Sequence, residues 1–267
     1  MNYNLGAQNF AMSELDPNIL TAELISRCIE AFVNNTLEKP TTALRRTWHT
    51  LANAYSPYLE QTYQRVSTIK TFLKTNEPIN ILDAYVPLSA KFGNSISSDL
   101  DIIESFKAGN KILVTATAGR GKSMLLRYIA TCMFEAGNGV IPLFLELRAL
   151  NHLTNKEILT FIHSTYRGTS NVNYKDFENA LRKGKFSLVL DGFDEVDHDS
   201  RREVEAKILD LSNNFPDTSI IISSRPDSQR FGSWEKFHHY NMCPMDLDQV
   251  RQLILKGTSK NRSSLSG

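Results

Sequence analysis

A short glycine-containing run followed by lysine and serine offers the first chemistry in the chain. Gly119 and Gly121 flank an arginine, and Lys122 and Ser123 follow directly. Glycines let consecutive backbone N–H groups turn inward around phosphate oxygens, and a helix that begins here presents its positive end to the same anion. Lys122 can reach the β- and γ-phosphates of a nucleotide, and the Ser123 hydroxyl can bind Mg²⁺. The residues predicted to form this phosphate-binding segment are Ala116, Thr117, Ala118, Gly119, Arg120, Gly121, Lys122 and Ser123.

The sequence on either side of this segment supports the interpretation. A β-branched, apolar run over 111–115 precedes it, and an apolar helical pattern over 122–136 follows it. Ala116 stands where the phosphate-loop motif usually has its first glycine. A small residue costs little at that position unless its φ is positive. The alternative is a chance Gly-Lys-Ser at the start of an amphipathic helix, which leaves the strand–loop–helix order unexplained.

The second group of candidate residues follows an apolar run at 186–190. Asp191 ends that run, and Asp194 and Glu195 lie just beyond it. At the carboxyl end of a buried strand, Asp191 can hold Mg²⁺ through its water shell. Glu195 is our first choice for the general base that deprotonates the attacking water, and Asp194 is the second. The alternative is an acidic loop that caps the helix after it.

A third candidate follows another β-rich run, over 219–223. Arg225 comes after two serines and before a proline, where its guanidinium could reach a γ-phosphate and sense its presence. The alternative is a surface arginine in a turn. The order of the strands favours a contact with the nucleotide, because this strand end would face the same edge of the sheet as Lys122 and Asp191.

The elements that must position these residues alternate between strands and helices, which is typical of an α/β fold with a mostly parallel sheet. We predict five strands, at 111–115, 140–145, 186–191, 219–223 and 237–242, and helices at 122–136, 156–164, 174–183 and 201–213. Before them, helices are expected at 16–34, at 42–51 and from Ser56-Pro57 to Leu73. The expected domains are a helical region at 1–79, a nucleotide-binding domain at 80–245, and a following helix with a flexible polar tail at 246–267.

Composition narrows the choice of partners and location. The 267 residues include 30 basic and 29 acidic side chains, so a net charge of +1 gives no strong nucleic-acid or membrane signal. No apolar run is long enough for a membrane span, and no secretory signal is recognisable. The three cysteines are scattered and form neither a disulfide framework nor a zinc-ligand spacing. A cytoplasmic location is expected.

The three motifs together resemble one known family. Ala-Gly-Arg-Gly-Lys-Ser at 118–123, Leu-Asp-Gly-Phe-Asp-Glu at 190–195 and Ser-Ser-Arg-Pro at 223–226, in that order, look like the NACHT domain of the AAA+-related STAND-class P-loop NTPases. The resemblance covers roughly 57–256 and implies a three-layer sandwich. It also implies ATP or ADP binding with Mg²⁺ and slow hydrolysis. Tyr85-Val86-Pro87-Leu88, and Tyr58-Leu59 through Ile69-Lys70-Thr71, also look like the segments before the phosphate loop in bacterial members that resemble antiphage defence proteins. The resemblance therefore implies a switch that self-associates with other NACHT-type protomers on activation.

Two other interpretations stay open. NACHT proteins usually continue into further C-terminal regions, which this sequence is expected to lack. The chain could therefore be a truncated nucleotide-binding module that regulates full-length relatives without significant catalysis. A metabolic P-loop kinase or transporter ATPase is disfavoured, because the sequence has no LSGGQ-like signature and no obvious lid for an acceptor substrate.

Overall fold

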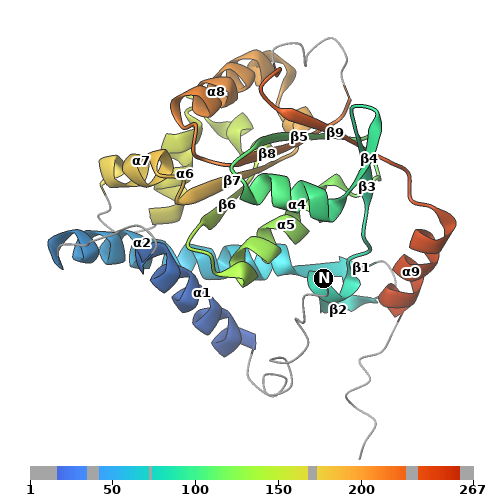
Figure 1. Cartoon of the computed structure of the whole chain (residues 1–267), viewed down its shortest axis with the longest axis horizontal. Coiled ribbons are helices and arrows are strands. Elements are labelled where there is room, and N and C mark those ends of the chain that lie inside the picture. Colours follow the sequence, from blue (N-terminus) through green and yellow to red (C-terminus); the bar gives the residue numbers. More distant parts are fainter. Residues whose placement is uncertain (1–16, 35–41, 72–73, 168–172, 227–233, 259–267) are drawn as a thin grey trace, which may run out of the picture.

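The computed structural model describes residues 17–34, 42–71, 74–167, 173–226 and 234–258. The centre of the molecule is a seven-stranded sheet with the order β4-β3-β9-β5-β8-β7-β6. Helices cover both of its faces (Figure 1). The strands are β3 (Ser89–Phe92), β4 (Ser95–Ser98), β5 (Lys111–Thr115), β6 (Ile141–Glu146), β7 (Phe186–Asp191), β8 (Ile220–Ser224) and β9 (His238–Met242).

The five predicted strands all form, and they run parallel to one another as β9, β5, β8, β7 and β6. The predicted total of five is wrong, because the antiparallel hairpin β3–β4 extends the sheet beyond β9. The hairpin turns at Gly93, whose φ is 57°. Its strands have four residues each and only Ala90 among them is buried, so the segment has no apolar run like those of the buried parallel strands.

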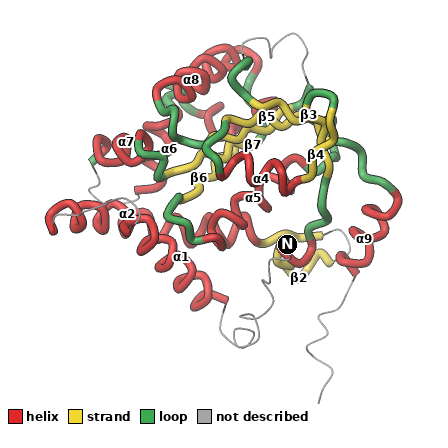
Figure 2. The backbone as a smooth tube through the Cα atoms, in the orientation of Figure 1, coloured by secondary structure: helices red, strands yellow, loops and turns green. Residues whose placement is uncertain are grey.

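Two helical layers enclose the sheet. α4 (Asp99–Lys107) and α5 (Lys122–Ala136) lie on one face, and α6 (Ile158–Arg167), α7 (Tyr174–Arg182) and α8 (Arg201–Asn214) lie on the other (Figures 1 and 2). This division follows from right-handed crossovers, since the chain moves across the sheet in one direction between β4 and β6 and returns in the other. The predicted three-layer α/β arrangement is therefore present.

The N-terminal region differs from its prediction. α1 (Pro17–Asn34) is followed by a single helix α2 (Thr42–Ser67), which continues through Pro57 where a new helix was predicted. Tyr55 and Leu59, on either side of the proline, are both fully buried, so tertiary packing outweighs the local signal to break. The chain then forms a two-stranded sheet, β1 (Thr68–Thr71) and β2 (Lys74–Asn80), instead of continuing as helix. The predicted end of that helix, Leu73, is outside the described residues.

The remaining elements connect these layers. α1 and α2 pack on α5, and α2 also packs on α6. A short helix α3 (Ile81–Ala84) leads toward the hairpin, a 3-10 turn η1 (Leu147–His152) follows β6, and α9 (Leu247–Thr258) forms the helix predicted after the sheet. The polar tail predicted beyond it lies outside the described residues.

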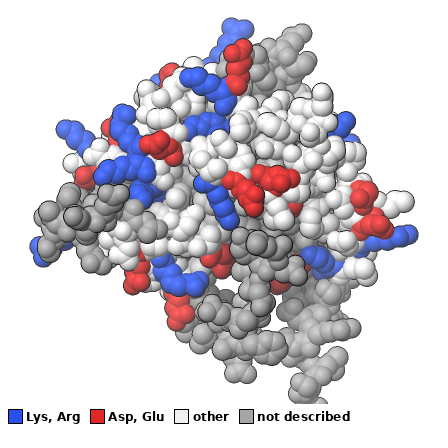
Figure 3. Space-filling model, viewed as in Figure 1, with Lys and Arg blue, Asp and Glu red and all other residues white. Residues whose placement is uncertain are grey.

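The surface and the helices bear on two expectations about partners. On the face shown in Figure 3, basic and acidic side chains are interspersed, in keeping with the small net charge. Among the described helices, none combines the length and apolar character that a membrane-spanning helix needs.

Candidate functional site

The predicted phosphate-binding segment links β5 to α5 at the carboxyl edge of the sheet. Gly119 and Gly121 have φ values of 77° and 87°, in the left-handed region that favours glycine. Gly121 is the N-cap of α5, so no side chain caps the first N–H groups of that helix. An added Cβ at Gly121 would also lie 3.2 Å from Leu88 Cδ1. The loop thus directs backbone donors and the positive helix end toward one position.

Lys122 lies at the centre of the charges around this loop. Its ammonium donates a hydrogen bond to the carbonyl of Ala116, at 2.8 Å. Burial lowers the pKa of Lys122, while Asp194, Asp191 and Glu195 raise it and Arg225 lowers it further. The structure therefore brings the lysine into electrostatic reach of all four candidate residues that follow the other two strands. No described residue other than glycine has a positive φ, so alanine replaces glycine at position 116 without backbone strain.

Asp191 is oriented by the neighbouring strand. Ser223, fully buried in β8, donates its hydroxyl hydrogen to Asp191 Oδ1 and accepts a hydrogen bond from the Gly192 N–H at 2.8 Å. One serine thus holds both the carboxylate and the start of the acidic loop. We did not predict this role, although the two serines that end an apolar strand are a usable signal.

Asp194 and Arg225 form a pair that we did not predict. Arg225 Nε lies 2.8 Å from Asp194 Oδ2, and the Arg225 backbone N–H donates to Asp194 Oδ1 at 3.1 Å. Both carboxylate oxygens of Asp194 are therefore engaged by one residue. Asp194 thus holds both the side chain and the backbone of Arg225.

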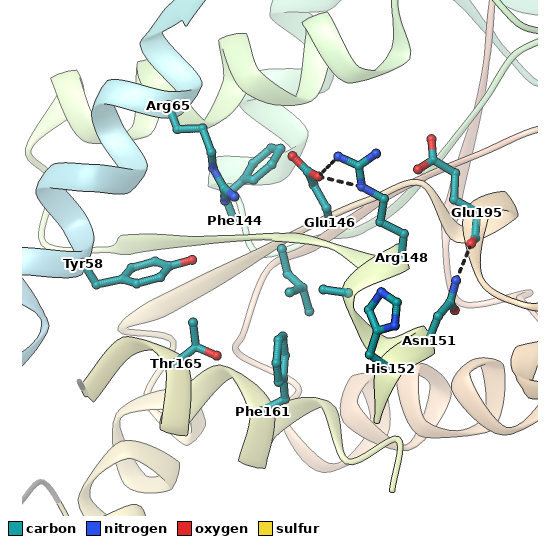
Figure 4. A pocket seen from close by; sticks show the side chains of 12 residues that line it. Tyr58, Arg65, Phe144, Glu146, Arg148, Asn151, His152, Phe161, Thr165 and Glu195 are labelled. Atoms are coloured by element: carbon teal, nitrogen blue, oxygen red, sulfur yellow. Dashed lines mark hydrogen bonds and ion pairs between the residues drawn. The ribbon is translucent and has the colours of Figure 1, made fainter. Parts of the chain in front are cut away.

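Glu195 is exposed, and its side chain folds back over Gly192. Gly192 has a φ of 79°, and an added Cβ there would lie 3.1 Å from Glu195 Cδ. The glutamate also lies at one end of a cavity of about 530 Å³ (Figure 4). The cavity is lined by side chains from α2 (Tyr58, Arg65), β6 (Phe144, Leu145, Glu146), η1 (Arg148, Ala149, Asn151, His152) and α6 (Phe161, Thr165).

Glu146 adds a further carboxylate at this edge of the sheet. It pairs in register with Asp191 on the neighbouring strand. Arg148 donates to Glu146 Oε2 from Nη2 at 2.5 Å and from Nε at 3.0 Å. These bonds and the charge of Glu146 raise the pKa of Arg148, and Glu195 and Asp191 raise it further. The position of Glu146 at the end of a strand is a signal in the sequence, but its pairing with Arg148 is not.

The residues present fit a magnesium-bound nucleotide. The loop supplies uncapped backbone donors, Lys122 a cation, Ser123 an exposed hydroxyl and Asp191 a half-buried carboxylate at the adjacent strand end. Within the described ranges, no three acidic, histidine or cysteine side chains gather into a protein-only metal cage. Mg²⁺ does not need one, since it usually combines one or two side chains with phosphate oxygens and waters.

The fold and this loop define a P-loop NTPase. The family model that matches is the NACHT domain, over residues 110–261, which is more than half of the chain. The chain belongs to the NACHT domain family, a class of nucleotide-binding STAND-type NTPases. No curated protein matches the sequence.

Proposed function

We propose that this protein is a nucleotide-dependent switch that binds ATP or ADP with Mg²⁺ and hydrolyses ATP slowly. The observation that carries the proposal is the loop between β5 and α5, where two left-handed glycines and an uncapped helix N-terminus adjoin Lys122. The charges of Asp191, Asp194, Glu195 and Arg225 all act on that lysine. An anionic ligand with a metal ion would balance the carboxylates and the cations that meet there.

Each residue has a role in this proposal. The backbone of 116–123 and the Lys122 ammonium bind the phosphates, while Ser123 and Asp191 hold Mg²⁺. The bound metal would neutralise charge on the phosphate oxygens. Glu195 accepts the proton of the attacking water. Arg225 contacts the terminal phosphate, and Asp194 orients Arg225 until that phosphate arrives.

The pairing at the site supports slow turnover. Lys122 is hydrogen-bonded to Ala116, and Arg225 is bonded to Asp194. Both cations must exchange a protein partner for a phosphate oxygen before the site is complete. The same pairing favours a second candidate function, a nucleotide-binding module that regulates full-length relatives without significant catalysis.

The wider role that we propose is antiviral, antiphage defence in the cytoplasm, with self-association of NACHT-type protomers in the ATP-bound state. Its support is the resemblance of the segments before the phosphate loop, Tyr58 to Thr71 and Tyr85 to Leu88, to those of bacterial defence proteins of this family. The family match itself supports nucleotide binding.

Calorimetry and turnover measurements on three variants test the proposal. Lys122→Ala should weaken Mg-ATP and Mg-ADP binding by at least about 100-fold, or about 2.7 kcal/mol, because the phosphates lose their cation. Glu195→Gln should keep the Kd within about two-fold and lower turnover by about 10²–10⁴. Lys175→Ala, on an exposed lysine of α7, is the matched control and should change neither.

Each outcome has a distinct meaning. Absence of Mg-nucleotide uptake by the wild type would overturn the proposed function. Equal turnover in the wild type and Glu195→Gln would remove the assignment of Glu195. Tight binding without any turnover would favour the regulatory module.

A further inference from the structure

The backbone of the acidic loop after β7 is held by side chains from two other elements. Asn151, in the η1 turn, makes two of these bonds. Its Nδ2 donates to the carbonyl of Glu195 at 3.0 Å, and its Oδ1 accepts the Asp197 N–H at 3.0 Å. Figure 4 shows the first bond, with Asn151 beside Glu195 at the end of the cavity.

The chemistry of this contact is specific to a primary amide. One planar group supplies a donor and an acceptor, which match a carbonyl and the N–H two residues later. A carboxylate at the same position would keep the acceptor and lose the donor, and an alkyl side chain would lose both. The two bonds therefore fix the backbone between the Glu195 carbonyl and the Asp197 N–H.

The η1 turn that carries Asn151 has an anchor of its own. Lys156 is 6% exposed, and its ammonium donates to three carbonyl oxygens in the turn and at its end: Leu150 at 2.8 Å, Asn151 at 3.3 Å and Leu153 at 2.6 Å. A buried cation that is shared among three carbonyls fixes the turn at its base. Asn151 thus acts from a fixed platform.

Arg201 of α8 holds the loop from a second element. Its Nη2 donates to the carbonyl of Asp194 at 2.7 Å, and its Nε donates to the carbonyl of Val196 at 2.8 Å. With the Asn151 bonds, the carbonyls of three successive residues and the N–H of Asp197 are all occupied by side chains. The freedom left to Glu195 is the rotation of its own side chain.

We infer that Asn151 is a positioning residue for Glu195, which it places by fixing the backbone on which the carboxylate stands. The inference rests on the proposed function, in which Glu195 is the general base. Misplacing the base should lower kcat without weakening nucleotide binding, because binding depends on the loop at 116–123. The side-chain hydrogen bonds of Asn151 are with the backbone of Glu195 and Asp197, outside the segment at 116–123.

The test compares Asn151→Ala with Asn173→Ala. Asn173 is a matched control, since its side chain also accepts a backbone N–H, that of Lys175 at 3.0 Å, at the start of α7 and away from the site. Asn151→Ala should lower kcat by about 10- to 100-fold and leave KM within about two-fold. Asn173→Ala should change neither. A rise in KM with an unchanged kcat would overturn the inference.

A double variant separates positioning from general weakening. In the Glu195→Gln background, Asn151→Ala should lower turnover by less than about two-fold, since its route of action is already gone. A full multiplicative loss in that background would contradict the inference.

Hydrogen–deuterium exchange gives a measurement that does not depend on turnover. Exchange in a peptide that covers 192–198 should accelerate in Asn151→Ala, because the Asp197 N–H loses its acceptor. Unchanged exchange would overturn the inference. A wild type without turnover would instead overturn the proposed function, and the exchange result would still decide whether Asn151 fixes the loop.

Discussion

The two ends of strand β7 show how one element serves stability and chemistry in different ways. At the amino end, Phe186 is 1% exposed and packs against the rings of Phe32, Tyr55 and Phe177, with centroid distances of 5.5, 5.8 and 5.3 Å. At the carboxyl end, Asp191 is half-buried and bonded to a serine. One end is fixed by shape and apolar burial, and the other by directional polar bonds.

A left-handed glycine lies near each end of the strand, and the two have different neighbours. At Gly184, with φ 61°, an added Cβ would lie 2.6 Å from the backbone carbonyl oxygen of Asp217. At Gly192, with φ 79°, the nearest atom would be Glu195 Cδ at 3.1 Å. Gly184 allows the backbone of Asp217 to approach closely, whereas Gly192 leaves space for the side chain of Glu195. The first is needed for packing and the second for the position of a functional group.

The largest expected effect is at the aromatic end. Phe186→Ala should lower the free energy of unfolding by about 3–5 kcal/mol, because a large fully packed ring leaves a cavity. Nucleotide affinity of the folded protein should stay within about two-fold, since the site is at the other end of the strand. Denaturant unfolding and calorimetry measure the two quantities. Phe186→Leu, which fills more of the space, should cost less than Phe186→Ala, and a large loss of affinity in either variant would break the comparison.

The glycines give a matched pair of intermediate size. Gly184→Ala should cost about 2–4 kcal/mol of stability, because a left-handed alanine is strained and its methyl group meets a backbone oxygen. Turnover per folded molecule should not change. Gly192→Ala should cost about 1–2 kcal/mol, the strain alone, yet lower turnover by about 10-fold as Glu195 is displaced. Thermal unfolding and steady-state kinetics decide the matter, and equal kinetic effects at the two glycines would show that neither is tied to catalysis.

The sequence predicts the strands that carry the site better than it predicts the other elements of the fold or the contacts within the site. Short β-branched, apolar runs predicted β5, β6, β7 and β8, because burial on both faces leaves a clear pattern. β9 (His238–Met242) has a mixed burial pattern and a weaker signal in the sequence. The hairpin β3–β4 leaves no such pattern, and Pro57 is a local signal that the burial of Tyr55 and Leu59 overrides. The roles assigned to the residues of the carboxyl edge remain predictions.

Partners within the site could not be predicted for a related reason. Asn151 meets the acidic loop across 44 and 46 positions of sequence, and Arg225 meets Asp194 across 31. Periodicity and motif spacing describe neighbours along the chain and the ends of strands. Which polar side chains then bond to one another depends on how the turns after those strands are placed, and that is set by the packing of the helices around them.

The smallest effect on stability is expected at Arg225, and it sharpens the comparison most. The pair with Asp194 has a counterpart near the amino end of β7, where Arg182 Nη2 lies 2.8 Å from Glu178 Oε1. The arginines are 64% and 52% exposed. Because both arginines are largely exposed, solvent weakens the two ion pairs, and Arg225→Ala and Arg182→Ala should each cost about 1 kcal/mol or less.

Function should separate the two arginines where stability does not. If Arg225 contacts the terminal phosphate, its removal should weaken Mg-ATP binding by about 10-fold and leave Mg-ADP binding within about two-fold. Arg182→Ala should change neither, as titration with the two nucleotides would show. An equal loss of ATP and ADP affinity in Arg225→Ala would mean that the arginine does not distinguish the third phosphate. Its bond to Asp194 would then serve to hold the acidic loop, as Arg201 and Asn151 do.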